Sequence, residues 1–229
     1  MIHHRKIILF SSLLICLSGC GFNFDYLGSR PVNAERGFWT IPHEEKIHFP
    51  DFSINLWPQN DIKTFEMGYF IIIPFYFKTE DTPVYNDARF KIRFAIQPHK
   101  NDLTFNPSQI TLQVGDKQIP VIGIDGPLNT YPVRGEDDIR VIEAWTKRGS
   151  IMCYSENAGS FRNHSPQILI NLSNLDKWHC YEIIFDTEIP PPDQDFSITI
   201  RGVSRNGASY EIPTVLFEKF KWGRADSAP

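Results

Sequence analysis

The sequence predicts an all-β protein, and in particular an antiparallel β-sandwich with little helix. Several segments alternate apolar and polar residues with a period of two, which is typical of strands that are buried on one face. The chain contains 18 phenylalanines and 17 prolines, a balance that favours strands separated by turns. Strand candidates follow one another from residue 46 almost to the end of the chain, as in a sandwich. Their spacing does not separate an immunoglobulin-like topology from a jelly-roll-like one.

The first strand candidates lie between residues 46 and 97. Residues 46–57 alternate on both sides of Pro50, which marks a bend. Residues 65–77 are almost continuously apolar, and we expect one strand there that is bulged or lies at a sheet edge, because Pro74 cannot donate a ladder hydrogen bond. Residues 89–97 alternate cleanly and should bury one face. The residues expected on that face are Phe90, Ile92, Phe94 and Ile96.

Two hairpins and one ambiguous segment follow. Residues 108–124 predict a hairpin with Gly115 and Asp116 at its turn, and the Asn206-Gly207 pair predicts a second one. Residues 135–149 begin with acids and end with bases before a glycine, which favours a short helix, although their Ile and Val residues suit a strand equally well. The remaining strand candidates are residues 167–172, 178–186, 195–203 and 208–222.

The N-terminus has the pattern of a secretory signal peptide. Arg5 and Lys6 precede an apolar run, Ile7–Leu17, with no acid among the first residues. A basic start followed by roughly 7–15 apolar residues and a small-residue end is the signal-peptide pattern. The run is shorter than the roughly 20 apolar residues that a membrane-spanning helix needs.

The end of this run, Leu17-Ser18-Gly19-Cys20, resembles the lipobox of bacterial lipoproteins. In that family a leucine is followed by two small residues and an invariant cysteine, whose thiol receives a diacylglycerol before the signal is removed. The resemblance implies that Cys20 is the first residue of the mature chain and that its new amine is usually acylated too. Two or three acyl chains would anchor the protein stably in a lipid bilayer, which one chain alone would not do.

The residue after the cysteine bears on the compartment. An aspartate there commonly retains such lipoproteins in the inner membrane, and this chain has Gly21. The resemblance therefore implies a lipid anchor in the outer membrane with the folded domain in the periplasm, and exposure at the cell surface is the alternative.

These patterns predict one folded domain. Residues 1–19 form the signal peptide, 20–45 the lipidated N-terminus and a tether, 46–222 a single β-sandwich, and 223–229 a frayed tail. Removal of Arg5 and Lys6 leaves 21 of the 23 basic residues against 27 acids, a formal net charge of −6. An acidic chain of this kind argues against a nucleic-acid partner.

Four cysteines have three expected fates. Cys16 leaves with the signal peptide, Cys20 is acylated, and Cys153 and Cys180 remain as a pair in an oxidising compartment, where a disulfide is expected. Two buried free thiols are the alternative. Alternation within residues 178–186 directs Tyr181 toward the core and Cys180 to the outer face, so that the disulfide would attach a surface segment to the sheet.

The sequence contains no catalytic signature that we can assign. Segment 43–48 approaches the zinc motif H-E-x-x-H, but His43 and His48 are five positions apart and cannot share a helix face, so we expect neither a metal nor a cofactor. His99 and His164 lie in loop-like segments and are interpreted as solvated. Trp39 and Trp57 lie near loop edges and are candidates for ligand stacking, with a structural role as the alternative.

Two hypotheses of function follow. In the first, the β-sandwich binds an unidentified envelope protein or glycan as a scaffold or assembly module. In the second, the protein is an envelope hydrolase or carbohydrate-binding protein whose site is assembled from distant loops. A histidine within hydrogen-bond reach of a serine or carboxylate in a convergent pocket would favour the enzyme.

The anchor has a direct test. Cys20→Ser should abolish incorporation of radiolabelled palmitate, because the thioether needs a thiol and cleavage before residue 20 follows lipidation in this family. Labelling of the wild-type chain is the positive control. Labelling that persists unchanged in the variant would contradict the lipoprotein resemblance.

Overall fold

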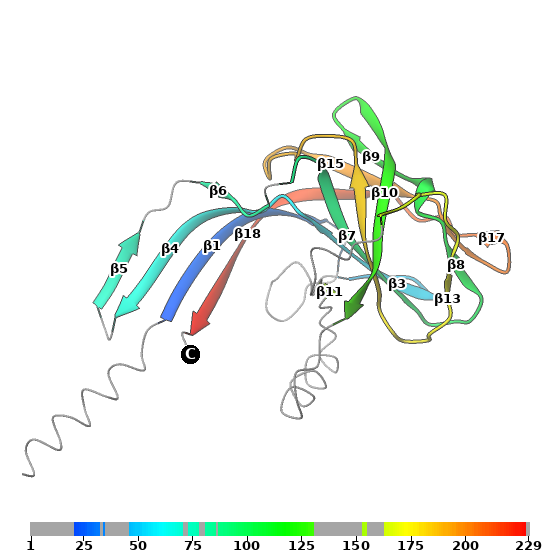
Figure 1. Ribbon diagram of the computed structural model, residues 1–229, viewed down its shortest axis with the longest axis horizontal. Helices are drawn as coiled ribbons and strands as arrows, with labels where there is room; N and C mark the ends of the chain where they lie inside the picture. Colours follow the sequence, from blue (N-terminus) through cyan, green and yellow to red (C-terminus); the bar gives the residue numbers. More distant parts are fainter. Residues whose placement is uncertain are drawn as a thin grey trace, which may run out of the picture.

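Antiparallel strands make up nearly all of the computed structural model, which describes residues 21–32, 34, 46–70, 73–77, 81–85, 87–130, 153–154 and 163–227 (Figure 1). The large sheet has 14 described strands. Its order is β2 (Ile47–His48), β3 (Phe52–Pro58), β7 (Phe90–Pro98), β14 (His179–Phe185), β10 (Lys117–Thr130), β9 (Ile110–Val114), β15 (Phe196–Ile200), β18 (Val215–Ser227), β1 (Gly21–Pro31), β4 (Ile62–Phe70) and β5 (Ile73–Phe77), with β11 (Cys153–Tyr154) and β12 (Asn163–His164) beside β10, and β6 (Thr82–Pro83) beside β4.

A second, smaller sheet lies against the curl of the large one. Its order is β13 (Ile170–Leu172), β8 (Leu103–Phe105), β16 (Val203–Arg205) and β17 (Ala208–Ser209). A turn of 3-10 helix spans Pro107–Gln109, and the described residues contain no α-helix. The chain is therefore an antiparallel β-sandwich, as its sequence predicts.

The core lies between the two sheets and is rich in aromatic rings. Phe94 of β7 stacks on Phe105 of β8 with ring centroids 4.7 Å apart, which joins the large sheet to the small one. At the other side of the core Phe196 stacks on Phe217, with centroids 4.6 Å apart. The four residues expected on the buried face of residues 89–97 are all fully buried, so that prediction is confirmed.

Both predicted hairpin turns are present. Gly115 between β9 and β10 has φ +57°, and Asn206 and Gly207 between β16 and β17 have φ values of 49° and 80°. Tight hairpin turns require positive φ, which glycine and asparagine adopt with little strain. Local sequence was sufficient here because the turn residues themselves carry the conformational preference.

Residues 65–77 do not form the single strand that we expected. They belong to two strands, β4 and β5, which pair with each other from Glu66↔Phe77 to Phe70↔Ile73. Among the described strands β5 is the last of the sheet and pairs only with β4, so Pro74 lies at an edge as predicted. Residues 69–77 are continuously apolar and contain no glycine, so they carry no local signal that separates the two strands.

The segment that we expected to be a tether contributes a strand. Residues 21–31 form β1, which pairs along its whole length with β18, from Gly21↔Ser227 to Pro31↔Phe217. Most of the expected frayed tail, through Ser227, likewise belongs to β18. The tether prediction was wrong because Gly, Asn and Asp interrupt the alternation of residues 21–31, so that this strand depends on its partners rather than on its own pattern. The tail prediction was wrong because residues 223–227 pair with β1.

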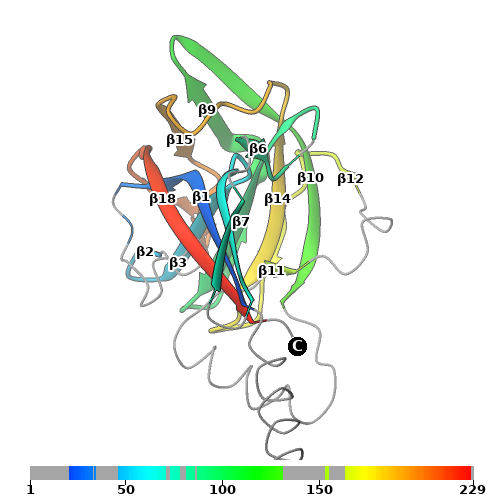
Figure 2. The same cartoon turned by 90° about the vertical axis from the view of Figure 1, so that its left-hand side faces the viewer.

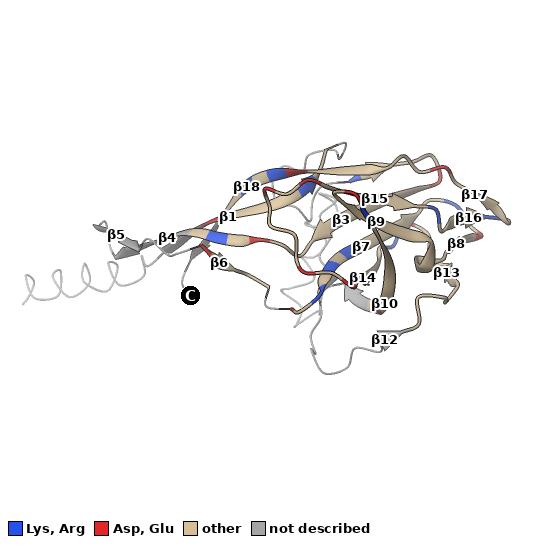
Figure 3. Ribbon diagram, turned by 90° about the horizontal axis from the view of Figure 1, so that it is seen from above, with Lys and Arg blue, Asp and Glu red and all other residues tan. Residues whose placement is uncertain are grey.

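The paired strands β1 and β18 form a ribbon, flanked by β4, that extends well beyond the sandwich (Figure 1). Figure 2 views the molecule from the ribbon side, with β1 and β18 next to each other. We call this pair the β1–β18 ribbon. Ion pairs of Arg30 with Glu218 (2.7 Å) and of Lys221 with Asp25 (3.0 Å) join its strands. Basic and acidic residues are interspersed along it in the view of Figure 3.

The segment 135–149, with its expected short helix, lies outside the described residues, as do Cys20 and Trp39. Within the part of the chain that is described, we find no helix with the length and apolar character needed to cross a bilayer.

The stacked rings that join the two sheets make a testable contribution to stability. Phe94→Ala should lower the free energy of unfolding by about 3–5 kcal/mol, because it removes a buried ring and leaves a cavity. Urea unfolding measures the change. Leu169→Ala, at a side chain that is 63% exposed, is the control and should change stability by less than about 0.5 kcal/mol. Equal effects of the two substitutions would contradict this assignment.

Candidate functional site

A chain of hydrogen bonds connects four polar side chains at the edge of the large sheet. Ser53 lies on β3 opposite His48 of β2, and its Oγ is 2.8 Å from His48 Nδ1. The same Oγ is 2.8 Å from His99 Nε2, and His99 Nδ1 is 3.1 Å from Asp176 Oδ1. We call these four residues the Ser53 relay.

Backbone contacts fix the loops that carry the relay. The amide of His99 donates to the Asp51 carbonyl (2.8 Å), and the amide of Asp176 donates to the Pro98 carbonyl (2.8 Å). Asp176 adopts φ 57°, a conformation that aspartate tolerates better than most residues. The relay is therefore positioned by the ends of β3, β7 and the loop before β14.

The relay has the atomic order of a Ser-His-Asp triad but the opposite accessibility. In such triads the serine hydroxyl attacks the substrate and the aspartate is buried behind the histidine. Here Ser53 is fully buried, with 0% of its surface exposed, and the Asp176 side chain is 76% exposed. Because the Ser53 hydroxyl lies between two imidazoles and away from solvent, this geometry suits a structural hydrogen-bond network better than a nucleophile.

A second polar cluster surrounds Asp61, directly after β3. The Asp61 carboxylate accepts a hydrogen bond from Trp57 Nε1 at 3.3 Å and another from Trp222 Nε1 at 3.1 Å. Asp61 is only 3% exposed. Burial raises its pKa from the ordinary 3.8 to about 6, although the two indole N–H groups and the Arg93 charge act to lower it. Burial in the folded protein therefore favours the neutral form of this carboxyl group.

The surroundings of Asp61 come from five strands. Arg93 of β7 lies 5.3 Å from the centroid of the Trp57 ring and 3.4 Å from Glu182 Oε1 of β14, while Gln59 Nε2 donates to the same oxygen at 2.8 Å. The Tyr26 ring of β1 stacks on Trp222 of β18, with centroids 4.3 Å apart. We call this set the Asp61 cluster: Tyr26, Trp57, Gln59, Asp61, Arg93, Glu182 and Trp222.

Gly28 of β1 is required by the close approach of the Asp61 cluster. A Cβ atom at this position would lie 2.0 Å from Asp61 Oδ1. Beside it, Asn60 Nδ2 donates to Ser29 Oγ at 2.9 Å and to the Pro190 carbonyl at 3.1 Å. The cluster thus holds the ribbon against the end of β3.

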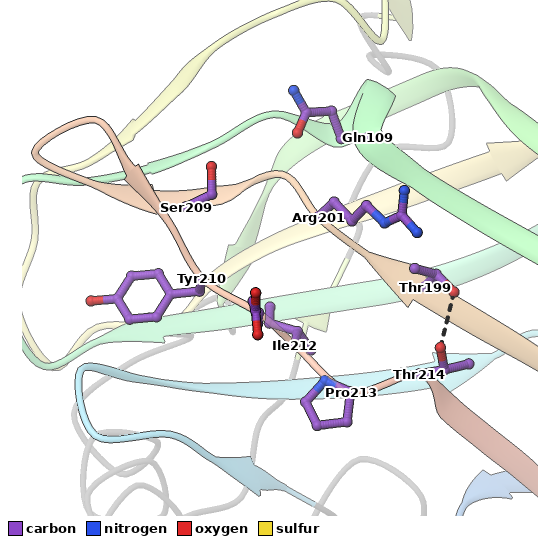
Figure 4. Close-up of a pocket in the computed structure, with 9 residues that line it drawn as sticks. Gln109, Thr199, Arg201, Ser209, Tyr210, Ile212, Pro213 and Thr214 are labelled. Atoms are coloured by element: carbon purple, nitrogen blue, oxygen red, sulfur yellow. Dashed lines mark hydrogen bonds between the residues drawn. The ribbon is translucent and has the colours of Figure 1, made fainter.

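An open surface groove of about 730 Å³ lies at the β17 end of the sandwich. Its lining is mostly polar: Gln109, Thr199, Arg201, Ser209, Tyr210, Glu211, Ile212, Pro213 and Thr214. Figure 4 shows the Arg201 side chain on one side and Tyr210 pointing away from it, while the Oγ1 atoms of Thr199 and Thr214 meet at 3.2 Å. Hydroxyls with charges of both signs suit a polar ligand or an extended segment of a partner protein.

Tyr210 at the rim of the groove is held by a neighbouring carboxylate. Its hydroxyl donates to Asp51, which also accepts from Arg205 Nη1 at 3.1 Å. The Tyr210 hydrogen bond lowers the pKa of Asp51, and the nearby Arg205 adds to this effect. The rim of the groove is therefore connected to the loop between β2 and β3.

The candidate residues from the sequence lie in different places. Trp57 belongs to the Asp61 cluster, where Arg93 and Asp61 contact it; its role in ligand stacking stays a prediction. Cys180 is fully buried beside Ala95 and Trp178, on the face of β14 opposite Tyr181 as the alternation predicted. That face is covered rather than open, since Glu182 and Ile184 are also buried.

Sequence reasoning missed both polar clusters. His99 was interpreted as a solvated loop residue, and its partners Ser53 and Asp176 are 46 and 77 positions away. Asp61 and Trp222 are 161 positions apart. The Gln59-Asn60-Asp61 run after an alternating strand was a usable signal, but it reads equally well as a solvated turn.

Comparisons with known proteins leave the site to be judged on its geometry. No family model matches the chain, and neither a curated protein nor a solved structure matches it. Among the described residues, no three His, Cys, Asp or Glu side chains are grouped so that they could hold a metal ion.

The buried Asp61 should make stability depend on pH. Its raised pKa means that folding favours the neutral acid, so the stabilisation is complete below about pH 3.8 and is lost as the pH rises through about 6. The free energy of unfolding falls by roughly 3 kcal/mol in this range, because each unit by which the pKa of the folded state exceeds that of the unfolded state is worth about 1.4 kcal/mol. Asp61→Asn should remove this decline, as measured by urea unfolding between about pH 4 and pH 7.

Asp193→Asn, in an exposed loop, is the matched control and should leave the pH profile of the wild-type chain unchanged. A profile for Asp61→Asn that runs parallel to the wild-type profile would show that Asp61 is not the group responsible.

Proposed function

We propose that this protein is an outer-membrane lipoprotein that is anchored by acylated Cys20 and whose β-sandwich binds another component of the cell envelope. The observation that supports this most directly is the course of the β1–β18 ribbon. Gly21, the residue after Cys20, lies at the ribbon end that is far from β17 (Figure 1). The anchor and the open groove thus belong to opposite ends of the molecule.

The ribbon would hold the sandwich at a defined distance from the anchor. Eleven residues at about 3.4 Å each make β1 roughly 35 Å long, and the β18 pairing along its whole length makes it stiffer than a single chain. A sandwich held in this way would present its far end to the periplasm, or to the exterior if the anchor lies in the outer leaflet. Such an arrangement suits a scaffold or assembly module.

The groove is the surface that we assign to the partner. Arg201 and Glu211 give it charges of both signs, and residues 210–214 line it without belonging to a strand. An envelope protein with an extended polar segment, or a glycan, fits this lining.

A disulfide between Cys153 and Cys180 is part of this proposal. The strand register supports it, since Cys153 pairs with Thr130 of β10 and Cys180 pairs with Leu128 of the same strand. The two cysteines are near enough for a disulfide if β11 and β14 lie on the same side of β10. An oxidising envelope compartment would maintain it.

Arg201→Glu should abolish capture of the partner while leaving the fold intact, because it reverses the charge on one side of the groove. The acylated protein, solubilised from membranes after chemical cross-linking, would be affinity-purified and its adducts compared by mass spectrometry. Lys117→Glu, a similar charge reversal at an exposed position of β10, is the control and should retain the same adducts. Equal capture by wild type and Arg201→Glu would exclude the groove.

A hydrolase is the second candidate function, and the atomic order of the Ser53 relay is the observation that favours it. The burial of Ser53 weighs against this candidate, since a nucleophile must reach its substrate. Labelling by a fluorophosphonate probe that disappears in Ser53→Ala would overturn the binding-module proposal in favour of the hydrolase.

A further inference from the structure

The β4–β5 hairpin ends beside the predicted lipid anchor. In the strand register Tyr69 of β4 is opposite Gly21 of β1, and β4 and β5 pair as far as Phe70↔Ile73. The last paired residues of β4 and β5 are therefore level with Gly21, the residue after Cys20. Figure 1 shows β4, β5 and the start of β1 together at the end of the molecule away from the sandwich.

The sequence of this hairpin is unusual for a strand pair that extends away from the body of the protein. The eleven residues from Met67 to Phe77 carry no charge and read MGYFIIIPFYF, between Glu66 and Lys78. An apolar hairpin at the edge of a sheet tends to aggregate unless another surface covers it. An apolar surface that covers this segment would remove that tendency.

We propose that the paired ends of β4 and β5, Tyr69–Phe70 with Ile73–Phe75, insert into the interfacial region of the same bilayer that holds the acyl chains. The proposal rests on the proposed function in one respect, the acylation of Cys20. Aromatic side chains favour the boundary between headgroups and acyl chains. β4 and β5 pair with each other, and at this depth the outward backbone groups of β5 would meet water and headgroups. Pro74 further lowers the cost of insertion because it has no N–H group to satisfy.

The position of the hairpin favours lipid over a second copy of the chain. An acylated Cys20 keeps the bilayer next to Gly21, and therefore next to Tyr69, at all times. An association between two copies would depend on concentration and would leave the apolar run exposed whenever they separate. The hairpin would thus act as a second contact that fixes the angle at which the ribbon leaves the membrane.

A site-directed fluorescence experiment tests the insertion. The full-length protein is produced in its acylated form with Ile73→Cys, labelled with an environment-sensitive NBD probe and reconstituted in phosphatidylethanolamine–phosphatidylglycerol vesicles. Asp116→Cys, in the exposed turn between β9 and β10, is the control, and the unsubstituted chain measures background labelling. We expect blue-shifted emission at residue 73 and roughly twofold stronger quenching by nitroxide lipids than at residue 116, as for a side chain within the interface.

The result separates this inference from the lipid anchor. Mass spectrometry of the same sample reports acylation of Cys20. An acylated protein without lipid quenching at residue 73 would overturn the hairpin inference and leave the anchor standing, whereas quenching without acylation would overturn the anchor alone. A blue shift without quenching by nitroxide lipids would indicate a protein contact, including a second copy, and would also overturn the inference. Phe70→Cys, opposite Ile73 in the register, gives an independent probe should Ile73→Cys fold poorly.

Discussion

The buried Asp61 carboxylate is the constraint that connects the parts of this protein. It accepts hydrogen bonds from one indole on β3 and from another on β18, and it leaves no room for a side chain at Gly28 of β1. An unsatisfied buried carboxyl group would be costly, so these partners must all be in place together. The ribbon consequently leaves the sandwich in one direction, set by polar contacts as well as by strand pairing.

The direction of the ribbon would determine how the proposed anchor orients the sandwich. A lipid on a flexible tether would leave the sandwich free to take any orientation, but β1 belongs to the sheet from Gly21 onward. The orientation of the sandwich relative to the proposed anchor would therefore be set by paired strands. Because burial raises the pKa of Asp61 to about 6, the junction between ribbon and sandwich also holds the group whose protonation makes stability depend on pH.

The Ser53 relay shows why the identity and order of residues do not establish an activity. Ser53, His99 and Asp176 are hydrogen-bonded in the same order as the residues of a hydrolytic triad. Of these three, however, the serine is the most buried and the aspartate the most exposed. The second imidazole, from His48, occupies the other side of the hydroxyl. A hydrogen-bond network of this kind fastens the short β2 strand and the loop after β7 to β3, which is a structural role.

The sequence by itself determined the features that depend on neighbouring residues. Alternation in residues 89–97 defined the buried face of β7, and Gly115 and the Asn206-Gly207 pair defined two turns, because side-chain period and positive φ are local properties. The tertiary structure alone decided that residues 21–31 form a strand, that residues 65–77 form a hairpin, and that Asp61 meets Trp222. Each of these depends on pairing or burial between segments whose own patterns are ambiguous, and such contacts are selected only when the whole sheet assembles.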